Sequence, residues 1–135
     1  MPNRILVTLA AMATLTAPLP AAAFVTDNDF RTYPAGPDSV IVRPMGGGSA
    51  RDYFCAAGDW ARRVKGAPYG AYLVMTRSIA RDPDFRGAFT AEFTLAAPGS
   101  GDGAPGLFVA NRAGTSMSVA QARNVCFAHI LLPDD

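Results

Sequence analysis

The sequence is poor in the residues that most often carry chemistry. It has one histidine, His129, and two cysteines, Cys55 and Cys126, in 135 residues. Glu92 is its only glutamate and Lys65 its only lysine. Metal sites and nucleophile–base pairs need several such side chains in one place. The sequence therefore predicts no catalytic residue, no metal site and no cofactor.

Long apolar runs are also scarce, and the one that exists lies at the start of the chain. Residues 5–19 carry no charge and follow a short basic segment. This run is shorter than the roughly 20 residues that cross a bilayer as a helix. Ala21 and Ala23 are small residues at the two positions that a signal peptidase recognises. We predict a signal peptide over residues 1–23, cleaved between Ala23 and Phe24, and therefore a periplasmic or secreted protein without a membrane span.

Neither sign of charge dominates. The whole chain has a formal net charge of +1, and arginine greatly outnumbers lysine. Without the predicted signal peptide the net charge is about zero, which argues against nucleic acid or an anionic membrane surface as partner. Abundant alanine, glycine, proline and arginine are typical of a GC-rich bacterial genome. The partner that remains is another envelope or exported protein, and the oligomeric state stays open.

The two cysteines are widely separated, and no C-x-x-C motif is present. In an exported chain, a single pair is most simply one disulfide. A Cys55–Cys126 bond would close a loop of about 70 residues and add about 4 kcal/mol of stability in the chain-entropy model. A redox or metal role for the pair is the alternative, although two cysteines and one histidine make an incomplete metal site.

The remaining pattern predicts a small α+β domain over residues 38–135, preceded by an irregular lead-in over residues 24–37. Apolar periodicity predicts strands at 40–42, 71–76, 88–95 and 125–132 and helices at 50–65 and 118–124. A further short strand at 107–110 is left as an option. The order β-α-β-β-(β)-α-β, with an antiparallel sheet, is compatible with a ferredoxin-like arrangement. Periodicity alone leaves open whether 125–132 is a strand or a helix.

The helix predicted over residues 50–65 also supplies a candidate interaction surface. Its members are aromatic or basic: Tyr53, Trp60, Arg62, Arg63 and Lys65. Aromatic residues at helical spacing more often belong to the core, and cations in a last turn suit the helix dipole. The same residues therefore have a purely structural interpretation.

Two classes of function follow. The favoured hypothesis is a non-enzymatic binding, inhibitory or accessory protein of the bacterial envelope. The alternative is a small hydrolase or transferase that uses His129 with Glu92 or an aspartate as its acid–base pair. The run Gly46–Gly48 before Ser49 lacks the Lys-Ser/Thr ending of a phosphate loop, so we interpret it as a flexible joint and helix cap.

Overall fold

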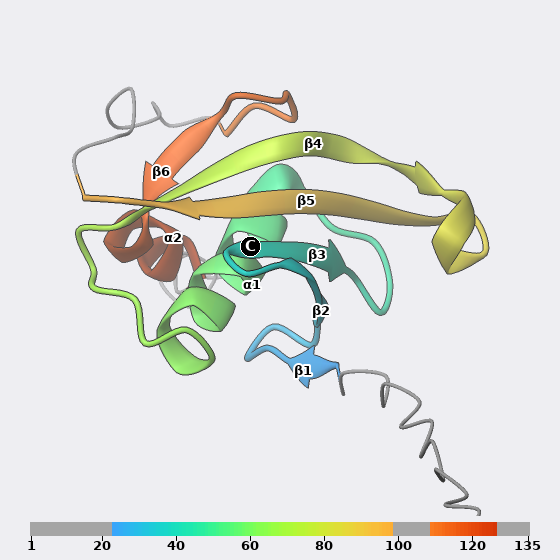
Figure 1. Cartoon of the computed structure of the whole chain (residues 1–135). Helices are drawn as coiled ribbons and strands as arrows, with labels where there is room; N and C mark the ends of the chain where they lie inside the picture. The colour runs from blue at the N-terminus through green and yellow to red at the C-terminus, as the bar shows by residue number, and fades with distance from the viewer. Residues whose placement is uncertain (1–22, 99–108, 127–135) are drawn as a thin grey trace, which may run out of the picture.

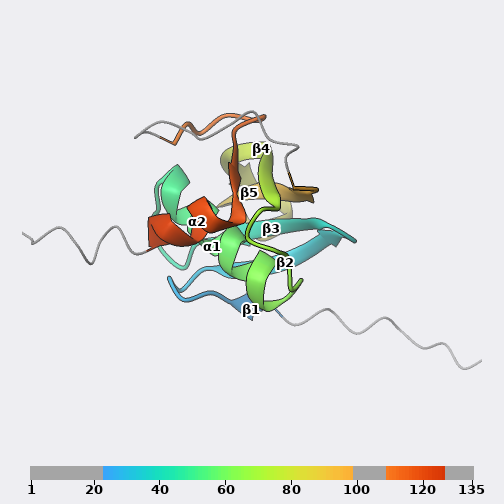
Figure 2. The same ribbon diagram turned by 90° about the vertical axis from the view of Figure 1, so that its left-hand side faces the viewer.

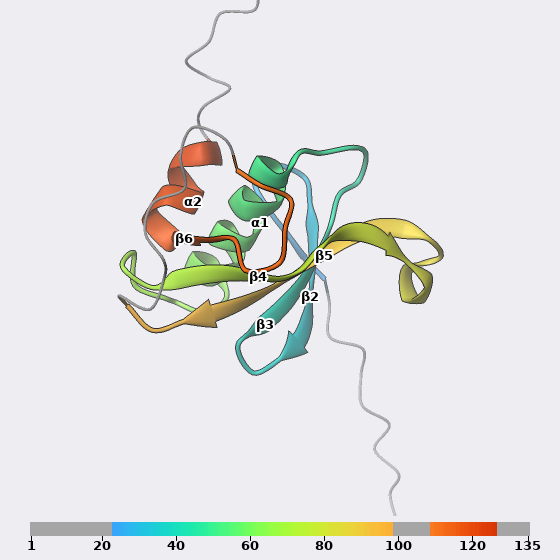
Figure 3. The same ribbon diagram turned by 90° about the horizontal axis from the view of Figure 1, so that it is seen from above.

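One antiparallel sheet of six strands carries both helices on one of its faces (Figures 1 and 3). The computed structural model describes residues 23–98 and 109–126. The strands are β1 (Phe24–Val25), β2 (Arg31–Gly36), β3 (Ser39–Arg43), β4 (Tyr72–Asp82), β5 (Ala88–Ala96) and β6 (Ser116–Ser118); the helices are α1 (Ala50–Arg63), the 3₁₀ turn η1 (Pro83–Phe85) and α2 (Val119–Cys126). The sheet order is β1-β2-β3-β5-β4-β6. The predicted α+β class with one disulfide is confirmed.

The centre of the sheet contains a split β-α-β unit. Strand β5 lies between β3 and β4 and pairs antiparallel with both, so β3 and β4 run parallel and α1 connects them. This unit matches half of the predicted ferredoxin-like arrangement. The remainder differs, because β2 forms a hairpin with β3 and takes the place beside it, while β6 pairs with the far side of β4. The described strands do not confirm a ferredoxin-like order.

The predicted irregular lead-in over residues 24–37 is wrong, because this segment contains β1 and β2. Thr32 of β2 is buried, and its hydroxyl donates to the backbone oxygen of Phe24 at 3.2 Å. Pro34 lies within β2, although proline lacks the backbone N–H that strand pairing uses. It is tolerated because β1 pairs only with Arg31 and Thr32, so Pro34 lies where β2 has no second neighbour.

The end of the described chain also departs from the prediction. Val125 and Cys126, expected to begin a strand over 125–132, lie in α2, and the rest of that prediction falls outside the described residues. Residues 109–110 are not in a strand, and residues 107–108 of that predicted element are likewise outside the description. The short strand β6 instead comes directly before α2.

The core lies between α1 and the sheet. Phe54 of α1 and Phe93 of β5 are fully buried, and their rings meet edge to face with centroids 4.8 Å apart. Helix α2 packs beside α1 (Figure 2), where a Cβ on Gly58 would lie only 2.7 Å from the Cβ of Ala122. A glycine in mid-helix costs about 1 kcal/mol relative to alanine, and here it permits the close helix contact. Neither helix among the described residues is long and apolar enough to span a membrane.

Candidate functional site

The hairpin of β4 and β5 extends beyond the other strands to the same end of the molecule as the loop that follows β3 (Figures 1 and 3). Between them is a cavity of about 270 Å³. We call it the apolar groove, and its lining residues are Pro44, Gly46, Gly47, Gly48, Tyr53, Ile79 and Phe89. The hairpin reaches this position with two register shifts in β4, between Met75 and Arg77 and between Arg77 and Ala80. Such bulges bend and twist a strand.

One large apolar side chain of this groove remains in contact with water. Phe89, which lines it, is 47% exposed. Met45, in the neighbouring loop, is 59% exposed but is not one of the lining residues. The guanidinium of Arg81 lies 4.6 Å from the centre of the Phe89 ring. Scattered exposed apolar residues are ordinary on protein surfaces, whereas apolar residues gathered at a concave site suggest an interaction surface.

Tyr53 closes the inner end of the groove. Its hydroxyl donates a long hydrogen bond, 3.5 Å, to the backbone oxygen of Phe89. Burial, and secondarily the negative charge of Asp52, raise the pKa of Tyr53 to about 12. The phenol therefore stays protonated at neutral pH and acts as a donor rather than as a base.

The three glycines of the loop have different roles. A Cβ on Gly48 would lie 2.7 Å from the ring of Phe30, so the fold requires glycine there. A Cβ on Gly46 or Gly47 would meet nothing within 4 Å, and neither residue has a left-handed φ. These two positions would accept a side chain, which means that packing and backbone geometry do not explain the glycines.

The helix that follows the loop is already capped. The carboxylate of Asp52 accepts hydrogen bonds from the backbone N–H of Ser49 at 2.8 Å and from its hydroxyl at 3.0 Å. This confirms Ser49 as the N-cap residue of α1. The protein's own carboxylate therefore lies where the positive end of the helix dipole would attract an anion.

A second cavity, of about 340 Å³, lies on the other side of the hairpin and has several charged side chains in its lining. Arg77 joins two carboxylates there, with Asp82 at 3.4 Å and Glu92 at 3.9 Å. Asp82, which is buried, also accepts from the Thr90 hydroxyl at 2.8 Å and the Asp84 backbone N–H at 3.0 Å. These contacts link β4 to β5 beside the register shifts and cap η1. The fold alone therefore accounts for this cluster.

The enzymatic alternative gains no support at this cavity. Glu92 is paired with Arg77, and His129 lies outside the described residues. Within residues 23–98 and 109–126, no three His, Cys, Asp or Glu side chains come together as a metal site would need.

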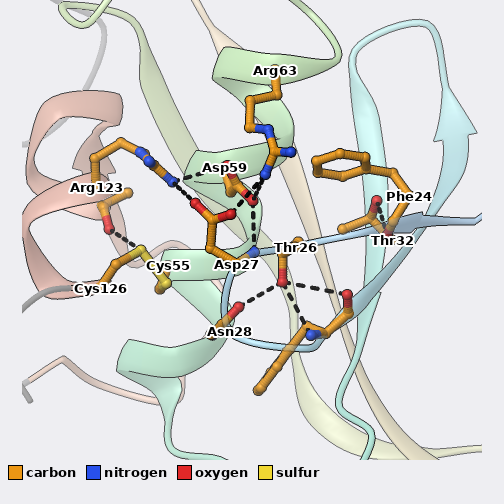
Figure 4. Close-up of polar contacts among 12 residues, drawn as sticks. Phe24, Thr26, Asp27, Asn28, Thr32, Cys55, Asp59, Arg63, Arg123 and Cys126 are labelled. Carbon is orange, nitrogen blue, oxygen red and sulfur yellow. Dashed lines mark hydrogen bonds and ion pairs between the residues drawn. A yellow bond between two sulfur atoms is a disulfide. The ribbon is translucent and has the colours of Figure 1, made fainter.

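The most buried charge of the described chain lies elsewhere, between the two helices (Figure 4). The carboxylate of Asp59 is fully buried and accepts from Arg123 of α2 at 2.9 Å, Arg63 at 3.2 Å and the backbone N–H of Asp27 at 2.9 Å. The carboxylate of Asp27 contacts both arginines from the solvent side, at 2.8 Å and 3.5 Å. This cluster fixes the β1–β2 loop and α2 onto α1. The i,i+4 spacing of Asp59 and Arg63 was a visible signal for one of its contacts.

The predicted interaction surface on α1 does not form as expected. Tyr53 and Trp60 belong to the core, with 1% and 4% exposure. Arg62 stacks on the ring of Tyr69 at 4.0 Å and donates to the backbone oxygen of Ala67. Its basic neighbours are also engaged: Arg63 joins the Asp59 cluster, and Lys65 donates to the oxygen of Pro37 at 2.6 Å and lies 3.7 Å from Asp38. The groove around Phe89, which sequence analysis missed, is the better candidate.

Comparison with known proteins identified no matching family model, no similar curated protein and no similar solved structure.

Proposed function

We propose that this chain is an exported, non-enzymatic protein that binds a segment of another envelope or exported protein in the apolar groove. The observation that carries the proposal is the exposure of Phe89 in that groove. Burying such a side chain against a partner releases about 25 cal/mol per Å² of apolar surface.

The size of the groove favours a protein segment over a small-molecule ligand. Sites for drug-sized ligands and cofactors usually enclose about 300–1,000 Å³. At about 270 Å³, the apolar groove lies just below that range. It suits one or two side chains of a larger partner.

Two features support export. Phe24, the residue that would follow the predicted cleavage, is also the first residue paired in the sheet, opposite Thr32. Cleavage after Ala23 would therefore retain every strand pair described. The Cys55–Cys126 disulfide is of the kind that persists in oxidising compartments.

Export is tested by producing the full chain in a bacterial host and measuring the intact mass of the periplasmic protein. We expect a chain that begins at Phe24 and gains the mass of two hydrogens on reduction. An uncleaved chain confined to the cytoplasm would contradict the export part of the proposal.

Binding is tested by placing a photo-crosslinking amino acid at position 89 and expressing the protein in the organism that encodes it. The matched control carries the crosslinker at Val64, which is also exposed, at 50%, but lies at the end of α1. We expect one defined adduct from position 89 alone. Equal labelling from both positions, or none from either, would contradict a binding role for the groove.

A further inference from the structure

We infer that the apolar groove recognises an extended, acidic peptide segment of its partner. One large apolar side chain of the segment enters the groove, its backbone pairs with the loop at residues 45–48, and a neighbouring carboxylate faces Arg81, which lies over the Phe89 ring. This inference deepens the proposed function and rests on it, because it specifies how the partner is recognised.

The loop offers an open backbone. Within the described residues, no backbone N–H or C=O of residues 45–48 has a hydrogen-bond partner. A row of such groups beside an apolar cavity matches the recognition of extended peptides, in which main-chain bonds give affinity and a pocket selects the side chain.

Gly46 and Gly47 fit this role. Their φ angles are available to any residue, and a Cβ at either position would enter open space. Glycine is also used where another backbone must approach closely. A peptide lying against the loop would supply the reason for glycine that the fold itself does not.

The charge beside Phe89 selects an acidic occupant. Arg81 covers the Phe89 ring and donates to the backbone oxygen of Gly87 at 3.1 Å. Arg81 has no ion pair within the described residues. Asp52, the carboxylate next to Tyr53 in sequence, is held by Ser49. The Phe89 side of the groove thus carries a positive charge, and a carboxylate on the peptide would complement it.

The test is a selection of linear peptides from a random phage-displayed library against the full chain with its disulfide oxidised. We expect enriched peptides that combine a large apolar residue with a nearby Asp or Glu. A synthetic peptide of the enriched sequence, carrying a fluorophore, is then titrated with the protein to measure Kd by anisotropy.

Three variants locate the site. Phe89→Ser and Gly47→Val are expected to raise Kd at least tenfold, the first by removing apolar contact and the second by keeping the peptide backbone away. Arg81→Glu is expected to weaken binding and to remove the acidic preference when the selection is repeated. The controls are Val64→Ser and Arg112→Glu, two exposed positions outside the groove, which should leave Kd unchanged. Circular dichroism confirms that each variant is folded.

Several results would overturn the inference: no enrichment, a basic consensus, equal weakening by the controls, or a concentration-dependent dimer that buries Phe89 in a second copy. These results are separable from failure of the proposed function. If crosslinking from position 89 persists in Gly47→Val and in Arg81→Glu, the groove binds a protein, but not through the loop backbone and not through a carboxylate. If crosslinking is absent altogether, the proposed function itself fails.

Discussion

Arg123 of α2 donates a 2.9 Å hydrogen bond to the fully buried carboxylate of Asp59 in α1. This pair lies beside the close contact of Gly58 with Ala122, and the disulfide joins Cys55 to Cys126 one turn along each helix. The two helices are thus linked by a covalent bond, a close backbone approach and a buried ion pair. The same carboxylate holds the backbone of Asp27, so one side chain positions three segments of the chain.

Replacing Asp59 should strongly destabilise the fold. Asp59→Ala leaves Arg63 and Arg123 without their buried partner, and removing one member of such a pair costs about 3 kcal/mol. Urea denaturation measures the loss. Asp27→Asn is the matched control and should cost less than about 1 kcal/mol, because the Asp27 side chain is 56% exposed. Equal losses for the two variants would show that burial does not govern this cluster.

The disulfide should contribute a comparable amount. Cys55 and Cys126 are separated by 71 positions, and closing a loop of that length gives about 4 kcal/mol in the chain-entropy model. A Cys55→Ala, Cys126→Ala double variant should lose about this much in urea denaturation. Reduced wild-type protein should behave like the variant. If reduction leaves the urea midpoint of unfolding unchanged, the disulfide does not stabilise the fold by constraining the unfolded chain.

Local sequence patterns predicted much of the secondary structure, whereas the pairing of segments distant in sequence could hardly be predicted. Ser49 as cap, Gly66 beyond the last turn and the alternation from Phe89 to Leu95 placed α1 and β5 closely. Strand β2 was missed because Pro34 is disfavoured in strands, and only its position beside a very short β1 makes it acceptable.

The candidate site was harder to predict because its parts are distant in sequence. The apolar groove combines a loop after β3, Tyr53 of α1 and two residues of the hairpin, Ile79 and Phe89. Local periodicity carries no information about contacts between segments this far apart in sequence. Tyr53 and Trp60 were considered for the surface because they are aromatic, yet their helical spacing indicated the core equally well. The contacts of Asp59 with Arg123 and with the Asp27 backbone also join segments distant in sequence, so local patterns could not predict them.

Asn111 should protect an open edge of the sheet. Its side chain bonds to the backbone of Ile79 in β4, accepting from the N–H at 2.7 Å and donating to the oxygen at 3.4 Å. It occupies the position that a neighbouring strand would take. Asn111→Ala should cost about 1 kcal/mol and expose β4 to pairing with other chains. Sedimentation should then show concentration-dependent association, whereas Asn124→Ala, at an exposed position, should remain like wild type.

The raised pKa of Tyr53 implies a loss of stability in alkali. Its folded pKa is about 12 against 10.0 in the unfolded chain, so the folded state retains the proton more tightly. The contribution is complete below pH 10 and is lost as the pH rises towards 12, by about 1–3 kcal/mol in total. Urea denaturation at several pH values should show this fall. Tyr53→Phe should remove it, and Tyr69→Phe should not; a parallel fall in all three proteins would assign the effect to other groups.

Two arginines oppose each other across strands β2 and β3. Arg31 and Arg43 are register partners, and neither has an ion pair within the described residues. Like charges directly opposite in an antiparallel pair are destabilising, and opposite charges contribute about 0.2–1 kcal/mol. Arg43→Glu should therefore raise the free energy of unfolding by about that amount. The gain should shrink as salt is added, because exposed charges are screened. Arg112→Glu changes the net charge equally but not this pair, so it separates local pairing from net charge. If both variants change stability alike, the cross-strand contact is not responsible.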